Sequence, residues 1–269
     1  MKIIRPYARM LSPHNFRTDP SFTPQDGVDL LRKIEWCARI SHRSEEDQQE
    51  TSYHRFIQTV VMKKGDWSVV EHAYVTVDAV VDRGVSHEWV RHRLASYTQE
   101  STRFVNYEKK MPPAFIYPQV DVECADCLSH DPGCDEFGYL LDAQGNWLYE
   151  HLVAGGTEHG GTQYRCPYDG NWLHSIFEAE KAYKSLLKKG WRPQEARSVF
   201  PNALATRIVS TLNLRAWRHI LIMRTTKETH PQFRQVSIPL LREFQRNIPI
   251  IYDDIEPGLS QAEALKKIQ

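Results

Sequence analysis

The sequence lacks an excess of charge of either sign, because 34 lysines and arginines face 34 aspartates and glutamates in 269 residues. Proteins that bind nucleic acids generally carry a basic excess, so any recognition of phosphate must be local. Long hydrophobic runs are also missing, since no stretch approaches the roughly 20 apolar residues of a membrane span. The N-terminal MKIIRPYARM lacks the apolar core of a signal peptide. We expect a soluble, cytoplasmic protein that binds neither membranes nor nucleic acid.

Cysteine is scarce, with five residues in the chain. In a cytosolic protein these are free thiols or metal ligands more often than disulfides. A C-x-x-C pair lets two thiolates reach one zinc ion, although a second such pair is missing. Two interpretations stay open, a structural zinc site or reduced thiols in a β-rich loop. The candidate zinc ligands are Cys124, Cys127, Cys134 and Cys166.

Hydrophobic periodicity predicts the main elements. Apolar residues alternate over 73–81, which is typical of a half-buried strand, and Ser86 is a candidate N-cap for a helix that runs to about Ser96. Helical spacing over 28–42 and 176–190 predicts two amphipathic helices.

The C-terminal third is expected to be helical. A stretch without glycine or proline predicts one long helix over 203–224, about 33 Å in length. A further helix over 233–246 is expected to break or bend near Pro239, and the polar tail from Asp253 is expected to fray.

These elements predict an α/β fold, a central sheet with long packed helices, in a single domain over 1–269. Residues 118–174 change character, with glycine, aspartate, cysteine and aromatic residues and a hairpin signal at 142–145. We expect a small β-rich insertion there.

A dense group of cationic and polar side chains lies between Glu88 and Arg103. Arginine binds phosphate through its fork of N–H groups, and the serine and threonine before Arg103 add hydroxyls and main-chain amides in a compact turn. If 87–96 is helical, Arg91 and Arg93 lie on different faces and contact different ligands. The alternative is an ordinary solvated helix with a charged surface.

The run Arg91-His-Arg-Leu-Ala-Ser-Tyr-Thr-Gln-Glu-Ser-Thr-Arg103 resembles the signature of flavin-dependent thymidylate synthases. The motif is long and polar, so chance agreement is far less of a concern than for a lone glycine-rich loop. Ser68-Val-Val-Glu-His72 and the segments 194–202 and 213–224 are similar to other parts of that family. The chain departs from the family pattern at Asp66, where histidine is common, and at Glu88, where some members carry an amide.

The resemblance implies which residues form the site. Those implied to contact FAD are Ser68, Arg91, His92, Arg93, Gln99, Asn213, Leu214, Arg215 and His219, with His230 nearby. Those implied to surround dUMP are Glu88, Trp89, Val90, Arg91, Gln99, Glu100, Ser101, Thr102, Arg103, Arg197 and Arg224.

Arg224 is the candidate catalytic residue, because a guanidinium beside the pyrimidine can stabilise negative charge without losing its own proton. Asn213, Trp217, Ile220 and Arg224 share one stripe of the expected long helix, which the resemblance favours as ligand-facing over core.

The resemblance also implies the reaction. NADPH reduces FAD, methylenetetrahydrofolate supplies one carbon, and dUMP becomes dTMP in a homotetramer with shared sites. Two alternatives stay open: a related flavin-dependent modification, such as hydroxymethylation or a dCMP substrate, and a non-catalytic nucleic-acid-binding protein with a zinc module.

Overall fold

The computed structural model describes residues 2–11, 24–109, 112–117 and 167–267. Its elements fall into two compact units. One comprises Met1–Tyr7, Val80–His87 and Gln99–Arg207, and the other comprises Ala8–Ala79, Glu88–Thr98 and Ile208–Gln269. We call them the first and the second unit and describe each by itself. None of the described helices is long and apolar enough to cross a membrane.

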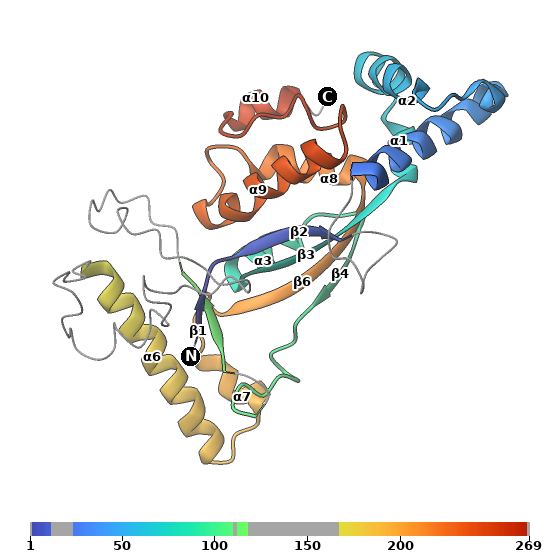
Figure 1. Cartoon of the computed structure of the whole chain (residues 1–269). Helices are drawn as coiled ribbons and strands as arrows, with labels where there is room; N and C mark the ends of the chain where they lie inside the picture. Colours follow the sequence, from blue (N-terminus) through green and yellow to red (C-terminus); the bar gives the residue numbers. More distant parts are fainter. Residues whose placement is uncertain (1, 12–23, 110–111, 118–166, 268–269) are drawn as a thin grey trace, which may run out of the picture. The chain divides into compact units, whose positions relative to one another are not determined.

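A four-stranded sheet has the strand order β2-β3-β6-β4, and most of its residues belong to the second unit (Figure 1). Its strands are β2 (Tyr7–Leu11), β3 (Tyr74–Asp82), β6 (Ala205–Asn213) and β4 (Ala95–Gln99). Val75, Val77 and Ala79 of β3 are buried, as the alternating pattern predicts. The expected strand over 73–81 is therefore confirmed, shifted by one residue.

Helices of the second unit come from both ends of the sequence. They are α1 (Pro24–Arg39), α2 (Ser52–Phe56), a π-helix (Ile57–Lys63), short 3-10 turns that include Trp67–His72, α8 (Leu214–Arg224), α9 (Pro231–Asn247) and α10 (Gln261–Lys266). Figure 1 shows α8, α9 and α10 grouped together. The helix expected over 28–42 is confirmed as α1 and the 3-10 turn Ile40–His42 that follows it.

The expected long helix over 203–224 is wrong in its first half, which is strand β6. Thr206, Ile208, Ser210 and Leu212 are buried at every second position, and the β-branched residues of this stretch favour a strand. The change to helix occurs at Asn213, whose side-chain oxygen accepts a hydrogen bond from the amide of Ala216 at 2.8 Å. An N-cap therefore begins α8 at Leu214, eleven residues later than expected.

Helix α3 (Arg83–Trp89) also differs from the expected 87–96. It begins earlier because the carboxylate of Asp82 accepts a hydrogen bond from the amide of Val85 at 2.8 Å, the contact of an N-cap. Ser86 lies inside the helix, where its hydroxyl donates to the carbonyl of Arg83. After Trp89 the chain turns, and Leu94 adopts a left-handed φ of 60° before β4.

Two C-terminal expectations also need correction. Helix α9 covers the expected 233–246 but continues through Pro239 without a break; the pyrrolidine ring is exposed there. Residues 261–266 of the polar tail form α10, because Ser260 and Glu263 make a reciprocal capping box.

The core of the second unit forms around Trp217 of α8. The Trp217 indole donates to the carbonyl of Val75 at 2.9 Å, and its ring packs against Phe244 at 5.5 Å. Phe244 in turn packs edge-on against Tyr252. The expected ligand-facing stripe is thus wrong at Trp217, which is fully buried in the core.

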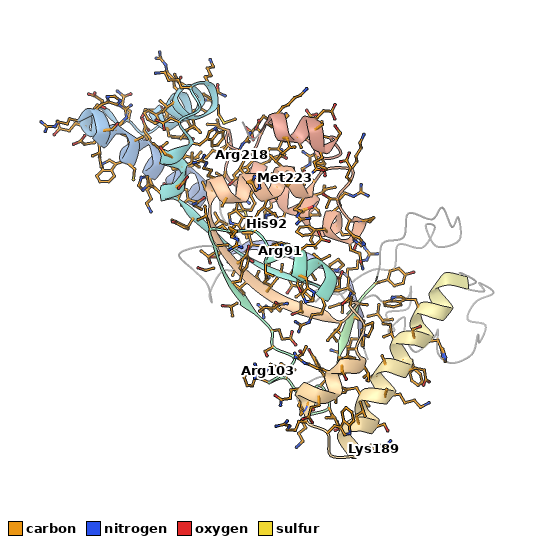
Figure 2. The ribbon with its side chains drawn as sticks, turned by 180° about the vertical axis from the view of Figure 1, so that it is seen from behind. Arg91, His92, Arg103, Lys189, Arg218 and Met223 are labelled. Carbon is orange, nitrogen blue, oxygen red and sulfur yellow. The ribbon has the colours of Figure 1, made fainter. Side chains whose placement is uncertain are left out.

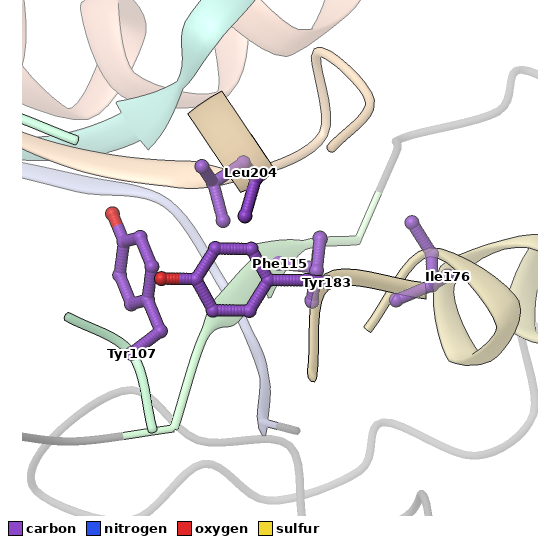
Figure 3. Packing of buried hydrophobic residues seen from close by; sticks show 6 residues of the cluster. Tyr107, Phe115, Ile176, Tyr183 and Leu204 are labelled. Carbon is purple, nitrogen blue, oxygen red and sulfur yellow. The ribbon is translucent and has the colours of Figure 1, made fainter. Parts of the chain in front are cut away.

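The first unit contains β1 (Lys2–Ile4), which pairs in parallel with β5 (Ala114–Ile116), together with α6 (Pro167–Lys188) and α7 (Pro193–Ala196). Aromatic side chains form its core (Figure 3). Tyr183 stacks on Phe200 with ring centroids 4.6 Å apart, and Tyr107 meets Tyr183 edge-on at 6.1 Å. The helix expected over 176–190 is confirmed as α6.

The α/β prediction is confirmed. Residues 118–166 of the expected insertion, with the hairpin signal at 142–145, lie outside the described residues. Residues 167–174 belong to α6 and not to a β-rich segment. The division into one domain stays a prediction.

Gly27 of α1 packs closely against the backbone at the end of α9. A Cβ atom at Gly27 would lie 1.6 Å from the carbonyl oxygen of Asn247. We predict that Gly27→Ala lowers the free energy of unfolding by about 1–3 kcal/mol, because the two helices must move apart. Urea denaturation measures this. Lys33→Ala, at an exposed position of α1, is the control, and equal stability of the two variants would contradict the close approach.

Candidate active site

A cavity of about 580 Å³ lies within the second unit, between α8 and the turn that follows α3. The turn contributes the segment 91–94, which Figure 2 marks by Arg91 and His92. Most of the residues implied to contact flavin line this one cavity: Arg91, His92, Arg93, Asn213, Arg215 and His219. Arg91 and Arg93 were expected on different faces of a helix. This is wrong, because α3 ends at Trp89 and both side chains line the same cavity.

The cavity wall is strongly cationic. Arg215 forms an ion pair with Glu71 at 2.6 Å, and both side chains are partly exposed. Arg91 and Arg93 are exposed, and within the described part of the chain their guanidinium groups have no partner. The cavity therefore presents two guanidinium groups that an anionic ligand can engage.

Arg218 is a wall residue that the sequence did not single out. It is 5% exposed and forms a bidentate ion pair with Asp254, with N–O distances of 2.6 and 2.7 Å. It also donates to the carbonyl of Ile251 at 2.6 Å and lies 4.8 Å from the ring centroid of Trp67. Through these contacts Arg218 attaches helix α8 to the segment 251–254, which follows α9.

Trp67, Glu71 and Leu94 also line the cavity and were missed. Trp67 directly precedes the segment Ser68–His72 that resembles the family, and Glu71 lies within it, so this segment was a usable signal. Leu94 gave no signal, because its exposure of 79% and its left-handed backbone arise only from the turn.

Three of the implied flavin contacts lie away from the cavity wall. The Ser68 hydroxyl donates to the carboxylate of Asp66 at 2.9 Å. The Gln99 amide donates to the hydroxyls of Ser86 and Thr206 in the first unit. Leu214 is buried, with its amide bonded to the carbonyl of Ala73 and its carbonyl accepting from Tyr252.

Arg224, at the end of α8, is held by several groups of the second unit. Its Nη1 donates to the Glu88 carboxylate at 2.6 Å, and its Nε donates to Nε2 of His92 at 3.0 Å. The guanidinium lies 4.8 Å from the ring centroid of Phe233, and the Ser237 hydroxyl donates to the Arg224 carbonyl at 2.6 Å. The group is therefore fixed before any ligand binds.

His92 must be neutral to accept this bond, because a protonated imidazole has no free lone pair. Desolvation, the charge of Arg224 and the neighbouring His219 lower the pKa of His92 to about 4. The pKa of His219 is lowered by desolvation and by Arg224. The two rings meet edge-on at 6.3 Å.

Glu88, Trp89 and Val90 differ in what they can offer a ligand. Glu88 is half-buried beside Arg224. Trp89 is buried and stacks on Phe233 with centroids 5.3 Å apart, so its ring belongs to the core. Val90 is partly exposed.

In the first unit, the turn 101–103 lies beside Arg197. The Arg197 guanidinium donates to the Thr102 hydroxyl at 2.6 Å and to the carbonyl of Gln194 at 3.2 Å. The Ser101 hydroxyl accepts from the amide of Arg103 at 3.3 Å, and the Arg103 side chain is exposed.

Glu100 ties this turn to the rest of the first unit. Its carboxylate accepts from the Tyr107 hydroxyl at 3.1 Å, and its amide donates to the carbonyl of Arg207. Arg197 and the turn 101–103 thus lie together in the first unit, and binding of phosphate by them stays a prediction.

The four candidate zinc ligands lie outside the described residues, and within the described residues no cluster of three or more His, Cys, Asp or Glu could hold a metal ion. His230 caps α9, where its Nδ1 accepts from the amide of Gln232 at 3.3 Å.

Comparison with known proteins identifies relatives over most of the chain. Proteins named flavin-dependent thymidylate synthase match at 29% identity over 238 residues in Mycolicibacterium gilvum, 28% over 241 residues in Mycobacterium tuberculosis and 27% over 223 residues in Corynebacterium aurimucosum. These matches cover 87%, 88% and 82% of this chain and 82%, 83% and 78% of the respective relatives.

A crystal structure of a UMP/dUMP methylase, PolB, from Streptomyces cacaoi bound with 5-Br dUMP has a similar fold. The TM-score is 0.62 at 19% identity, and the match covers 94% of this chain and 96% of that one. The model of the family described as thymidylate synthase complementing protein matches residues 28–250. The chain therefore belongs to the thymidylate synthase complementing protein family.

Proposed function

We propose that this chain is a flavin-dependent thymidylate synthase that converts dUMP to dTMP, using FAD, NADPH and methylenetetrahydrofolate. The observation that carries the proposal is the cavity of the second unit, where most residues implied to contact flavin line one space. Membership of the family, over residues 28–250, supports the same activity.

The cavity fits a flavin nucleotide in size and charge. Its volume of about 580 Å³ lies within the usual range of cofactor sites. Arg91 and Arg93 can hold the diphosphate, and Asn213 and His219 add polar edges to the wall. Bound there, the flavin supplies the hydride that completes the methyl group.

Arg224 is the residue that we assign to charge stabilisation on the pyrimidine. A methyl group is added at C5, which becomes more nucleophilic as negative charge develops on the ring. A fixed guanidinium stabilises that charge without the cost of reorganising at the moment of reaction. The contacts of Arg224 to Glu88, His92 and Phe233 supply this fixed position.

The phosphate of dUMP is assigned to the turn 101–103 and Arg197. Arg103 is exposed and Arg197 is held by the Thr102 hydroxyl, so the turn offers two guanidinium groups together with main-chain amides. Ser101 is assigned to binding and not to covalent catalysis, because its hydroxyl has no basic side chain as partner among the described residues.

The alternatives are not favoured. A changed product rested on Asp66 and on the expected insertion. The Asp66 carboxylate accepts from Ser68 and does not line the cavity, and residues 118–166 of the insertion lie outside the described residues. A non-catalytic nucleic-acid-binding protein is at odds with relatives that are named as enzymes over most of the chain. The zinc site, the homotetramer and the cytoplasmic location stay predictions.

The activity is tested directly with the purified protein. Incubated with FAD, NADPH, methylenetetrahydrofolate and dUMP, the wild type should produce dTMP, detected by chromatography and mass spectrometry. UMP and dCMP are run in parallel. Formation of a different modified nucleotide, or of none, would contradict the proposed function.

The phosphate assignment makes a separate prediction. Thr102→Val keeps a buried side chain of the same shape but removes the acceptor that holds Arg197 at 2.6 Å. We expect the dissociation constant for dUMP to rise about 10-fold, because the free energy of one hydrogen bond to a charged group corresponds to about that change in affinity. Calorimetric titration measures it.

Two controls separate this effect from general damage. Thr98→Val, at an exposed position of β4, should bind dUMP as the wild type does. Deoxyuridine, which lacks the phosphate, should bind wild type and Thr102→Val equally. An equal loss for deoxyuridine and dUMP would show that Thr102 does not act through the phosphate.

A further inference from the structure

The contacts of Arg224 use only part of its guanidinium group. Nη1 donates to Glu88 and Nε donates to His92. Within the described residues Nη2 has no partner, so its N–H groups are left to donate to a ligand.

The two acceptors lie close together in the sequence of the second unit, whereas the arginine that they hold does not. Glu88 is near the end of α3, and His92 lies in the turn that follows it. Arg224 is the last residue of α8, far away in sequence. The contacts therefore fix the guanidinium relative to the turn that also contributes Arg91 and Arg93 to the cavity wall.

Both acceptors are themselves held in place. Trp89, next to Glu88, is buried and stacks on Phe233, the same ring that lies under the Arg224 guanidinium. The carbonyls of Trp89 and His92 both accept from the Tyr97 hydroxyl, at 3.2 and 3.0 Å. One tyrosine of β4 thus fixes the turn between the two acceptors.

We propose that Glu88 and His92 are positioning residues that clamp the Arg224 guanidinium from two sides and direct Nη2 towards the pyrimidine of the substrate. The clamp rests on the proposed function for its substrate, and on the contacts of Arg224 with Glu88 and His92 for its geometry. Glu88 adds a second effect, because its carboxylate offsets the charge of Arg224 where an amide would not.

Neutral His92 is the condition for the clamp. Burial is the largest cause that disfavours protonation of His92, and the charges of Arg224 and His219, both from α8, add to it. The low pKa of about 4 keeps the imidazole an acceptor at neutral pH. The clamp is therefore intact above the ordinary histidine pKa, and protonation of His92 breaks it as the pH falls towards 4.

The test is a double-mutant cycle on dTMP formation with Glu88→Ala, Arg224→Lys and the two together. Glu88→Ala should lower kcat about 100-fold with little change in the KM for dUMP, because the guanidinium is misplaced while the phosphate contacts stay. Adding Glu88→Ala to Arg224→Lys should cause no further loss. Glu88→Gln, which keeps the acceptor, should recover most of the kcat, and Glu256→Ala, at an exposed position, is the control.

Losses that multiply in the double variant would overturn the clamp, since Glu88 would then act independently of Arg224. A rise in KM with kcat unchanged would also overturn it, because Glu88 would contact the substrate directly.

A second measurement does not depend on the reaction. NMR titration of the His92 ring protons should give a pKa of about 4 in the wild type and a higher value in Arg224→Ala, where the charge that opposes protonation is gone. A wild-type His92 that titrates near 6.5 would overturn the clamp even if dTMP is formed. A wild type that forms no dTMP but shows the low His92 pKa and its rise would refute the proposed function and leave the clamp standing.

Discussion

The change from strand to helix at Asn213 is the constraint on which the second unit depends. The side chain of Asn213 caps α8 by accepting from the amide of Ala216, and the first amide of the helix donates to the carbonyl of Ala73. Trp217 then anchors the helix to the sheet through the carbonyl of Val75. With the helix fixed at these points, Arg215, His219 and Arg224 each have a defined direction.

The arginines of the site divide by how their charge is balanced. Arg218 is buried and satisfied by Asp254, which is what burial of a guanidinium requires. Arg224 is part-buried and satisfied by Glu88 and His92, with one nitrogen still available. Arg91 and Arg93 are exposed at the cavity wall. The buried Arg218 is thus paired within the protein, Arg224 is paired but keeps one nitrogen for a ligand, and Arg91 and Arg93 have no partner among the described residues.

Much of the fold could be predicted from local patterns. The alternation in β3 and the helical spacing of α1, α6 and α9 are strong signals, and they were interpreted correctly. The stretch 203–224 was interpreted wrongly as one helix, because a lack of glycine and proline is compatible with a strand as well as with a helix. The β-branched residues between Thr206 and Thr211, together with the capping residue Asn213, were the signals that distinguish the two.

The residues of the site could be predicted from the sequence, but their arrangement in space could not. The motif from Arg91 to Arg103 indicated anion binding, yet it spans a turn, a strand and a second turn and not one helix. The clamp on Arg224 joins residues 132 and 136 positions apart, and the Arg218–Asp254 pair depends on where the chain returns after α9. Contacts of that kind depend on tertiary packing, which no local pattern encodes.

The central claim is that the cationic cavity of the second unit holds the flavin. Fluorescence titration of FAD into flavin-free protein tests it most directly, with wild type compared with the Arg91→Ala/Arg93→Ala double variant and with Lys33→Ala as control. The account predicts saturable binding by the wild type and the control, and at least about 10-fold weaker binding by the double variant, because two charged contacts to phosphate are lost. Equal affinity in all three proteins would place the flavin elsewhere and contradict the account.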